Sequence, residues 1–174
     1  VGGGIKSVED FKQVIQAGAD KVSIGSAVVK TPSIIKECAG EFGSPAVAVA
    51  IDVKQDDNGD YHVYIRGGRE NTGLGAVAWA KEVEALGAGE ILLTSMGKDG
   101  TKSGYDLSIS KKISRAVKIP IIASGGAGKK EDFYNVFTQA DADGALAASL
   151  FHFKEIDIRD LKEYLYARGI QVRR

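Results

Sequence analysis

The sequence predicts an α/β fold of the (β/α)8 barrel type, of which only a part is present, and three observations predict it. Strand-like apolar runs alternate with segments that have the periodicity of amphipathic helices. Polar or glycine-rich residues follow the strand-like runs, where barrels and doubly wound sheets both place their chemistry. The chain also repeats itself, because segments 1–11 and 19–26 resemble segments 123–133 and 142–149. The copies are about 122 residues apart, which at roughly 30 residues per strand–helix unit is half of an eight-unit barrel.

Two helices near the N-terminus are predicted from their capping residues. Ser7 and Asp10 have the spacing of a capping box, and the apolar residues after Ser7 fall on one helical face. A short strand over 21–24 separates this helix from the next. Thr31–Pro32 is a typical helix start, with Thr31 as the N-cap, and Gly43 is a typical helix end.

The next strand carries an insertion. The run Ala46–Ile51 has no polar interruption, which is typical of a parallel strand covered on both faces, and we expect Asp52 to end it. Asn58–Gly59 lies between two short β-prone runs and therefore predicts a hairpin. We expect this hairpin to be an excursion from one partial barrel domain over 1–174.

The second half of the chain continues the alternation. A glycine-rich loop over 96–105 is expected to lead into a helix that begins near Asp106. A C-terminal amphipathic helix is expected over 156–167, with Ile158 on its apolar side. The remaining elements in this half are a helix over 76–86 and strands over 90–95, 120–124 and 144–148.

About five complete strand–helix units can be identified, and a barrel of this type needs eight. Val1-Gly2-Gly3 has the character of the end of a sixth strand, since it matches the end of the strand over 120–124. We therefore expect the N-terminal strands of the barrel to be missing before Val1.

Composition limits the functional classes. Lys and Arg number 23, as do Asp and Glu, which argues against a broad nucleic-acid-binding surface. The apolar runs are far shorter than the roughly 20 residues needed to cross a bilayer, and we expect no signal peptide. Cys38, the single cysteine, is expected to be buried and reduced, which favours the cytoplasm. No cluster has metal-ligand spacing, so we expect neither metal nor cofactor.

Two glycine pairs stand at matching places in the repeat, and each is followed one strand later by a serine. Gly3–Gly4 corresponds to Gly125–Gly126, and Gly25–Ser26 corresponds to Ala148–Ser149. Backbone N–H groups at such loops and helix starts, together with a serine hydroxyl, suit phosphate oxygens. The alternative is that these glycines only form tight turns. Two such sites half a barrel apart predict a substrate with a phosphate at each end.

Four segments of the chain form long and specific motifs, residues 87–95, 99–106, 122–128 and 151–153. They resemble the cyclase subunit of imidazole glycerol phosphate synthase more than its sister isomerase of the same pathway. The similarity runs along the whole chain, which corresponds to the last two-thirds of that family's TIM barrel.

The resemblance implies a cyclase (lyase) of histidine biosynthesis. Family members add ammonia from a partner glutaminase to a bisphosphorylated aminocarboxamide ribonucleotide and cleave it into imidazole glycerol phosphate and an aminoimidazole carboxamide ribotide. Asp52 matches the family's general acid/base, although an aspartate here could instead cap a turn. Thr94, Asp99 and Ser124 match residues of the substrate cleft. The family's second catalytic aspartate comes from the first strand, so we expect this chain alone to be inactive.

The resemblance also implies a second functional end of the barrel. Asp20, Lys21 and Glu90 match positions that the family uses to gate or transmit ammonia from the glutaminase. Charged residues are also common at strand starts simply because strands begin near solvent. Lys21 occurs in only one copy of the repeat, whereas the aspartate occurs in both, and this difference favours a functional role for Lys21.

Two departures from the family keep other functions open. Gly25 replaces the usual asparagine and Gly97 the usual aspartate, so each position loses a side-chain hydrogen bond in the substrate cleft. One alternative is a paralogue that aminates a nucleotide-linked sugar with an amidotransferase. Another is a non-catalytic half-barrel that binds phosphates. The cut edges of the sheet further predict a homodimer or association with the missing N-terminal piece of the barrel.

Overall fold

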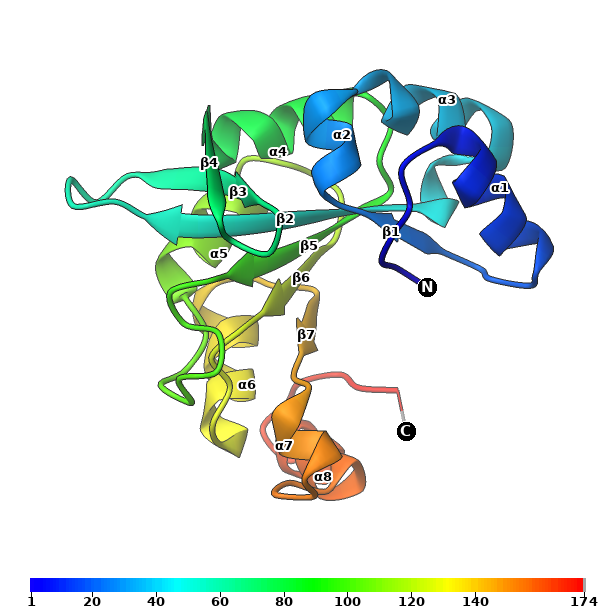
Figure 1. The fold of residues 1–174 in the computed structure, drawn as a ribbon. Coiled ribbons are helices and arrows are strands. Elements are labelled where there is room, and N and C mark those ends of the chain that lie inside the picture. Colours follow the sequence, from blue (N-terminus) through cyan, green and yellow to red (C-terminus); the bar gives the residue numbers. More distant parts are fainter. Residues whose placement is uncertain (174) are drawn as a thin grey trace.

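The computed structural model describes residues 1–173, and its centre is a curved sheet of seven strands (Figure 1). The strands are β1 (Val22–Ile24), β2 (Val47–Gln55), β3 (Tyr61–Ile65), β4 (Glu70–Gly75), β5 (Glu90–Ser95), β6 (Ile121–Ser124) and β7 (Gly144–Leu146). Five of them run parallel in the order β1-β2-β5-β6-β7. The expected α/β fold with a mostly parallel sheet is therefore confirmed.

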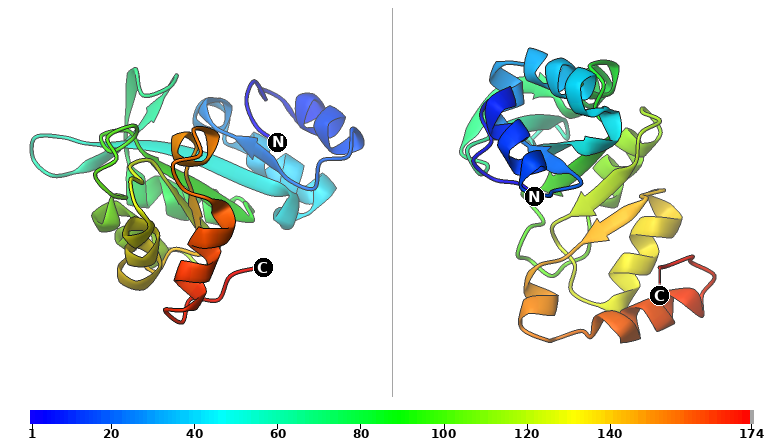
Figure 2. Two further views of the ribbon diagram at one scale, coloured as in Figure 1. Left: turned by 90° about the horizontal axis from the view of Figure 1, so that it is seen from below. Right: turned by 90° about the vertical axis from the view of Figure 1, so that its right-hand side faces the viewer.

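Eight helices accompany the sheet in the described chain. They are α1 (Val8–Gln16), α2 (Ser26–Lys30), α3 (Ser33–Phe42), α4 (Ala76–Ala85), α5 (Leu107–Ser114), α6 (Lys130–Gln139), α7 (Ser149–His152) and α8 (Ile158–Tyr166), with a short 3-10 turn, η1 (Ser44–Ala46), before β2. Figure 1 shows β2, β5, β6 and β7 in succession with α4, α5 and α6 along one side. Figure 2 shows α7 and α8 at the opposite end of the molecule from α1 to α3. None of the helices formed by residues 1–173 combines the length and apolar character needed to span a membrane.

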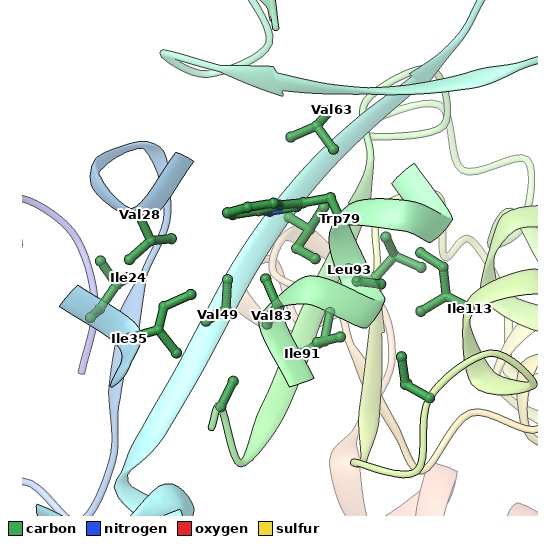
Figure 3. Packing of buried hydrophobic residues seen from close by; sticks show 14 of the residues in the cluster. Ile24, Val28, Ile35, Val49, Val63, Trp79, Val83, Ile91, Leu93 and Ile113 are labelled. Atoms are coloured by element: carbon green, nitrogen blue, oxygen red, sulfur yellow. The ribbon is translucent and has the colours of Figure 1, made fainter. Parts of the chain in front are cut away.

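The main core lies between the sheet and the helices that follow its strands. Alternate residues of the central strands point to this side, and they include Val49, Ile91 and Leu93, which are at most 1% exposed. Trp79 and Val83 of α4 pack among them (Figure 3). A second cluster joins β6 and α6 to α7 and α8, and Phe133 is its largest fully buried side chain.

The other face of the sheet is less covered. On this face Ala50 of β2, Leu92 of β5 and Ile122 of β6 lie in register and are only half-buried. The prediction that the strand over 46–51 is covered on both faces is therefore wrong for its second half. This partly open face matters for function because it carries polar side chains at the carboxyl ends of the strands.

The strand that contains Asp52 is longer than predicted. Asp52 does not end it, because β3 provides an antiparallel partner from Asp52↔Tyr64 to Gln55↔Tyr61 and so continues the backbone ladder. The predicted hairpin turn at Asn58–Gly59 is confirmed, with Gly59 at a φ of 88°. The additional edge strand β4 was not predicted, since its sequence is almost wholly exposed and has no alternation.

The predicted helix starts have mixed outcomes. The capping box is confirmed, because Ser7 Oγ accepts a 3.1 Å hydrogen bond from the Asp10 N–H and the Asp10 carboxylate accepts one of 3.1 Å from the Ser7 N–H. Thr31 is not the N-cap of α3. Its N–H instead donates to Ala27 O at 2.9 Å and ends the unpredicted helix α2. In α8, Leu161 and Leu165 are buried, but Ile158 is 50% exposed, so its predicted inward position is wrong.

Candidate active site

Three of the predicted site residues form one row across the partly open face. Asp52 of β2 lies in register with Thr94 of β5, and Thr94 lies in register with Ser124 of β6. Residues in register on neighbouring parallel strands point to the same face of a sheet. The three half-buried side chains therefore share one surface at the carboxyl ends of the strands. Parallel α/β sheets bind their ligands at this edge.

Asp52 has an unusual electrostatic environment. Burial raises the pKa of its carboxyl group, and the negative charge of Asp99 raises it further. Asp99 is exposed on the loop after β5, so the two predicted residues are brought into electrostatic contact. Asp52 lies inside β2, so the alternative that it caps a turn is wrong. A carboxyl group with a raised pKa can hold and release a proton closer to neutral pH, as a general acid/base must.

The first predicted glycine–serine set forms a pocket. The N-terminal segment pairs with β1, because Gly2 bridges to Ser23 and Val1 O accepts a 2.8 Å hydrogen bond from the Ser23 N–H. This pairing brings two separate loops to one end of β1 and encloses a volume of about 600 Å³. Its lining includes the predicted Gly3, Gly4, Gly25 and Ser26, together with Lys6, Lys30 and Arg66.

Gly3 and Gly4 are suited to this pocket by their conformation. Their φ angles are +98° and +75°, in the region that side chains other than glycine rarely adopt. A Cβ added at either position would have no heavy atom within 4 Å, so nothing in the described chain covers them. Their backbone groups can therefore be approached closely by a ligand.

The second predicted set has a different environment. Gly125 and Gly126 are buried beneath the loop over 96–105. A Cβ at Gly126 would lie 2.2 Å from Gly104 O, and the Gly104 N–H donates a 2.8 Å hydrogen bond to Gly126 O. These glycines thus allow close packing of the loop, and their role in phosphate binding stays a prediction. Ala148 and Ser149, the other two members of the set, are exposed at the start of α7.

Side chains at both ends fix the position of this loop. Lys102 Nζ lies 2.7 Å from both carboxylate oxygens of Glu155. Tyr105 Oη donates a 3.0 Å hydrogen bond to Leu146 O of β7. Asp106, at the start of α5, accepts hydrogen bonds from Tyr61 Oη at 3.0 Å and Ser95 Oγ at 2.9 Å, in a network that the sequence reasoning missed. Lys102 is therefore engaged by Glu155 in this structure.

Lys21 and Glu90 meet at the opposite end of the strands. Their side chains form an ion pair between the start of β1 and the start of β5. Glu90 lies in register with Ala48, four residues before Asp52 on β2, which is about 13 Å along the strand. Asp20 is exposed next to Lys21 in the chain.

Cys38 shows no sign of reactivity. Its side chain is fully buried in α3, and burial, followed by the charges of Glu37 and Glu41, raises its pKa to about 11. The thiol therefore stays protonated at neutral pH, as expected for a packing residue. Within residues 1–173, no three His, Cys, Asp or Glu side chains gather closely enough to hold a metal ion.

Sequence reasoning missed the three cationic residues of the pocket. Lys6 and Lys30 lie a few residues after the predicted glycines, so their spacing alone was an available signal. Arg66 is 40 residues from Ser26, yet its N–H donates a 3.1 Å hydrogen bond to Ser26 Oγ. Only the path of the unpredicted β3–β4 turn brings Arg66 there.

Comparison with known proteins places the chain among histidine-biosynthesis proteins. A family model described as "Histidine biosynthesis protein" matches residues 1–157. The chain is 62% identical over 174 residues to the imidazole glycerol phosphate synthase subunit HisF of Alkaliphilus metalliredigens (strain QYMF), covering 100% of this chain and 69% of that protein. The subunit HisF of Hydrogenobaculum sp. (strain Y04AAS1) is 57% identical over 173 residues, covering 99% of this chain and 69% of that protein. That of Clostridium botulinum (strain Okra / Type B1) is 55% identical over 174 residues, with the same two shares.

Proposed function

The chain belongs to the HisF family of imidazole glycerol phosphate synthase subunits, and from this premise we propose that it carries the cyclase (lyase) function of that enzyme in histidine biosynthesis. The proposed reaction adds ammonia to a bisphosphorylated aminocarboxamide ribonucleotide, closes a ring, and cleaves the product into imidazole glycerol phosphate and an aminoimidazole carboxamide ribotide. Both the addition and the cleavage require proton transfers.

The observation that carries the proposal is the environment of Asp52. A half-buried carboxyl group with a raised pKa, at the carboxyl end of a parallel strand, can act as the general acid/base. The hydroxyl groups of Thr94 and Ser124 share its row and can donate hydrogen bonds to substrate oxygens. Asp99 contributes by keeping the Asp52 pKa raised.

The pocket at the end of β1 supports one of the two phosphate sites. It combines accessible glycine backbone at Gly3 and Gly4 with the Ser26 hydroxyl and nearby cationic side chains. The second site, at Gly125–Gly126 and Ala148–Ser149, would require the loop over 96–105 to move away from the glycines. Loops of this kind commonly open and close around substrates.

We also propose that the sheet belongs to a (β/α)8 barrel. The parallel strands follow one another in chain order, and the buried face packs on helices while the other face stays partly open. A doubly wound sheet would carry helices on both faces. The matched relatives are longer, since the chain covers 69% of each, and the family's second catalytic aspartate is proposed to come from their additional strands.

Ammonia is proposed to arrive from a glutaminase partner at the opposite end of the strands. The Lys21–Glu90 ion pair lies there, on the same face of β5 as Thr94. Separation of the two side chains would open a path along this face, past Ala50 and Leu92, toward Asp52, and Asp20 is accessible to the partner because it is exposed.

A second candidate is amination of a nucleotide-linked sugar with an amidotransferase, and two glycines favour it. A Cβ at Gly97 would have no heavy atom within 4 Å, and one at Gly25 would make only ordinary contacts of 3.7 Å with Ala50. Packing therefore does not require glycine at either position. The loss of the family's polar side chains there can change which substrate is bound.

The test measures the rate of product formation from ammonium ions and the bisphosphorylated ribonucleotide. The chain is first mixed with the N-terminal third of the Alkaliphilus relative. Product formation is expected, and Asp52→Asn should reduce it by more than about 100-fold. Asp57→Asn, at an exposed carboxylate of the hairpin, is the matched control and should leave the rate unchanged. An equal rate in Asp52→Asn would overturn the role of Asp52. Amination of a nucleotide-linked sugar without turnover of the ribonucleotide would favour the second candidate.

A further inference from the structure

The pocket at the end of β1 has a strong local excess of positive charge. Lys6, Lys30 and Arg66 reach it from three separate segments, and none of the described lining residues carries a carboxylate. The whole chain is neutral, with 23 basic and 23 acidic residues, so this excess is particular to the pocket. Concave sites lined by one sign of charge attract ligands of the opposite sign.

Arg66 has a backbone conformation that is unusual for a residue with a side chain. It begins the turn between β3 and β4 with a φ of 56°, followed by Gly67 at 65° and Gly68 at 78°. Glycine adopts this left-handed region freely, whereas a Cβ disfavours it. Residues held in such conformations cluster at functional sites. Arg66 is the only residue of this left-handed run that is not glycine.

The conformation has a direct structural result, because it points the Arg66 N–H at Ser26. The N–H donates a 3.1 Å hydrogen bond to Ser26 Oγ across 40 residues of sequence. A hydroxyl group has two acceptor lone pairs and one proton. Once a lone pair accepts the Arg66 N–H, the Ser26 proton remains available to donate to an anion in the pocket.

The Arg66 side chain can be redirected into the pocket at little cost. Its Nε lies 3.3 Å from Glu70 Oε2 in an ion pair whose side chains are 65% and 46% exposed. Exposed ion pairs of this kind contribute little to stability, so a ligand can replace Glu70. A guanidinium group recognises phosphate with two parallel hydrogen bonds, which a lysine ammonium group does not provide.

We propose that Arg66 is a specificity-determining residue for a phosphate monoester: its N–H orients the Ser26 hydroxyl and its guanidinium group binds the phosphate. This inference rests on the proposed function and deepens it, since it assigns the phosphate recognised at the end of β1 to a residue from the inserted hairpin. Lys6 and Lys30 add positive charge to the pocket. Arg66 adds a planar guanidinium group that can form two parallel hydrogen bonds with the phosphate.

The experiment is calorimetric titration of the chain with glycerol 3-phosphate as the probe. Arg66→Gln is expected to weaken binding about tenfold, since it removes a charged hydrogen-bonding group. Arg66→Lys keeps the positive charge but loses the two parallel hydrogen bonds of the guanidinium group, and it should weaken binding about threefold. Glu70→Gln should strengthen binding, because it frees Arg66 from its ion pair. The matched control is Arg69→Gln in the same turn, which does not line the pocket and should bind as the parent chain does.

The outcomes separate this inference from the proposed function. Equal affinities for the parent chain and Arg66→Gln would overturn the role of Arg66 while leaving phosphate binding by the glycine pocket intact. Equal weakening by Arg66→Gln and Arg69→Gln would also overturn it, because general charge would then explain the effect. An absence of binding by the parent chain would overturn both the role of Arg66 and the phosphate site. The cyclase function would still be tested independently, by the rate of product formation in the ammonium assay.

Discussion

At the scale of single residues, Asp52 is retained at a cost to stability. Its pKa is raised above the ordinary value of 3.8, so the protonated form is favoured in the folded chain relative to the unfolded chain. The resulting stabilisation is present below about pH 3.8 and is lost as pH rises through the raised pKa. At neutral pH the ionised Asp52 therefore opposes folding. A purely structural role would be served better by asparagine, which argues against a non-catalytic scaffold.

The interaction between Asp52 and Asp99 leads to a prediction about pH. Asp99→Asn removes a negative charge, so the pKa of Asp52 is expected to fall toward its ordinary value while staying raised by burial. Carbon-13 NMR titration of the Asp52 carboxyl group measures this shift directly. The acidic limb of the rate profile should move to lower pH in the same variant. Asp57→Asn is the control, and an unchanged Asp52 titration in Asp99→Asn would show that burial alone raises the pKa.

At the scale of elements, the regular strands could be predicted from the sequence, and several small elements could not. The predicted strand over 90–95 coincides with β5, because a run of apolar residues within a parallel sheet has a clear local signal. By contrast, α2 has five residues and no side-chain cap, and β4 is almost wholly exposed. The position of β4 depends on its antiparallel pairing with β3, and that of α2 on its contact with α3.

The same distinction applies to the candidate site. Asp52, Thr94 and Ser124 lie in register on neighbouring strands of one parallel sheet, so their proximity follows from the strand register. The burial of Gly125 and Gly126 under the loop could not be predicted, because it depends on the backbone path from Ser95 to Gly104. Arg66 was missed for a similar reason, since its hydrogen bond to Ser26 depends on a left-handed turn.

The packing of the loop over 96–105 predicts the effect of a small substitution. Gly126→Ala should destabilise the chain by about 1–3 kcal/mol from backbone strain alone, because φ is +104° there, and the Cβ would also clash with Gly104 O at 2.2 Å. Urea unfolding measures the loss, and faster tryptic cleavage at Lys98 or Lys102 would report the displaced loop. Gly40→Ala is the control, because Gly40 is exposed in α3 with open space at its Cβ, and it should stabilise by about 0.5–1 kcal/mol. Equal stability of Gly126→Ala and the parent chain would contradict this packing.

At the scale of the whole molecule, the sheet leaves surfaces that favour association. Within residues 1–173, β7 pairs with β6 and with no other strand, and Leu146 at its end is 41% exposed. The unpaired edge of β7 continues into the partly open face of β2, β5 and β6. On that face Ala50, Leu92 and Ile122 are half-buried. Unpaired strand edges bind other strands readily. A partner that completes the sheet would cover the edge and the open face together.

We therefore expect the purified chain to form a dimer at micromolar concentrations, measured by size-exclusion chromatography with light scattering. Leu146→Lys places a charge at the free end of β7 and should shift the population toward monomer, since charged edge residues oppose strand pairing. Leu74→Lys is the matched control, because Leu74 is 36% exposed on β4, away from the open edge of β7. The N-terminal third of the Alkaliphilus relative should compete with self-association, because its strands would bind the same open edge of β7 as the second copy does. A parent chain that stays monomeric at all concentrations and ignores that segment would contradict the expectation, and the open face would then serve ligand access alone.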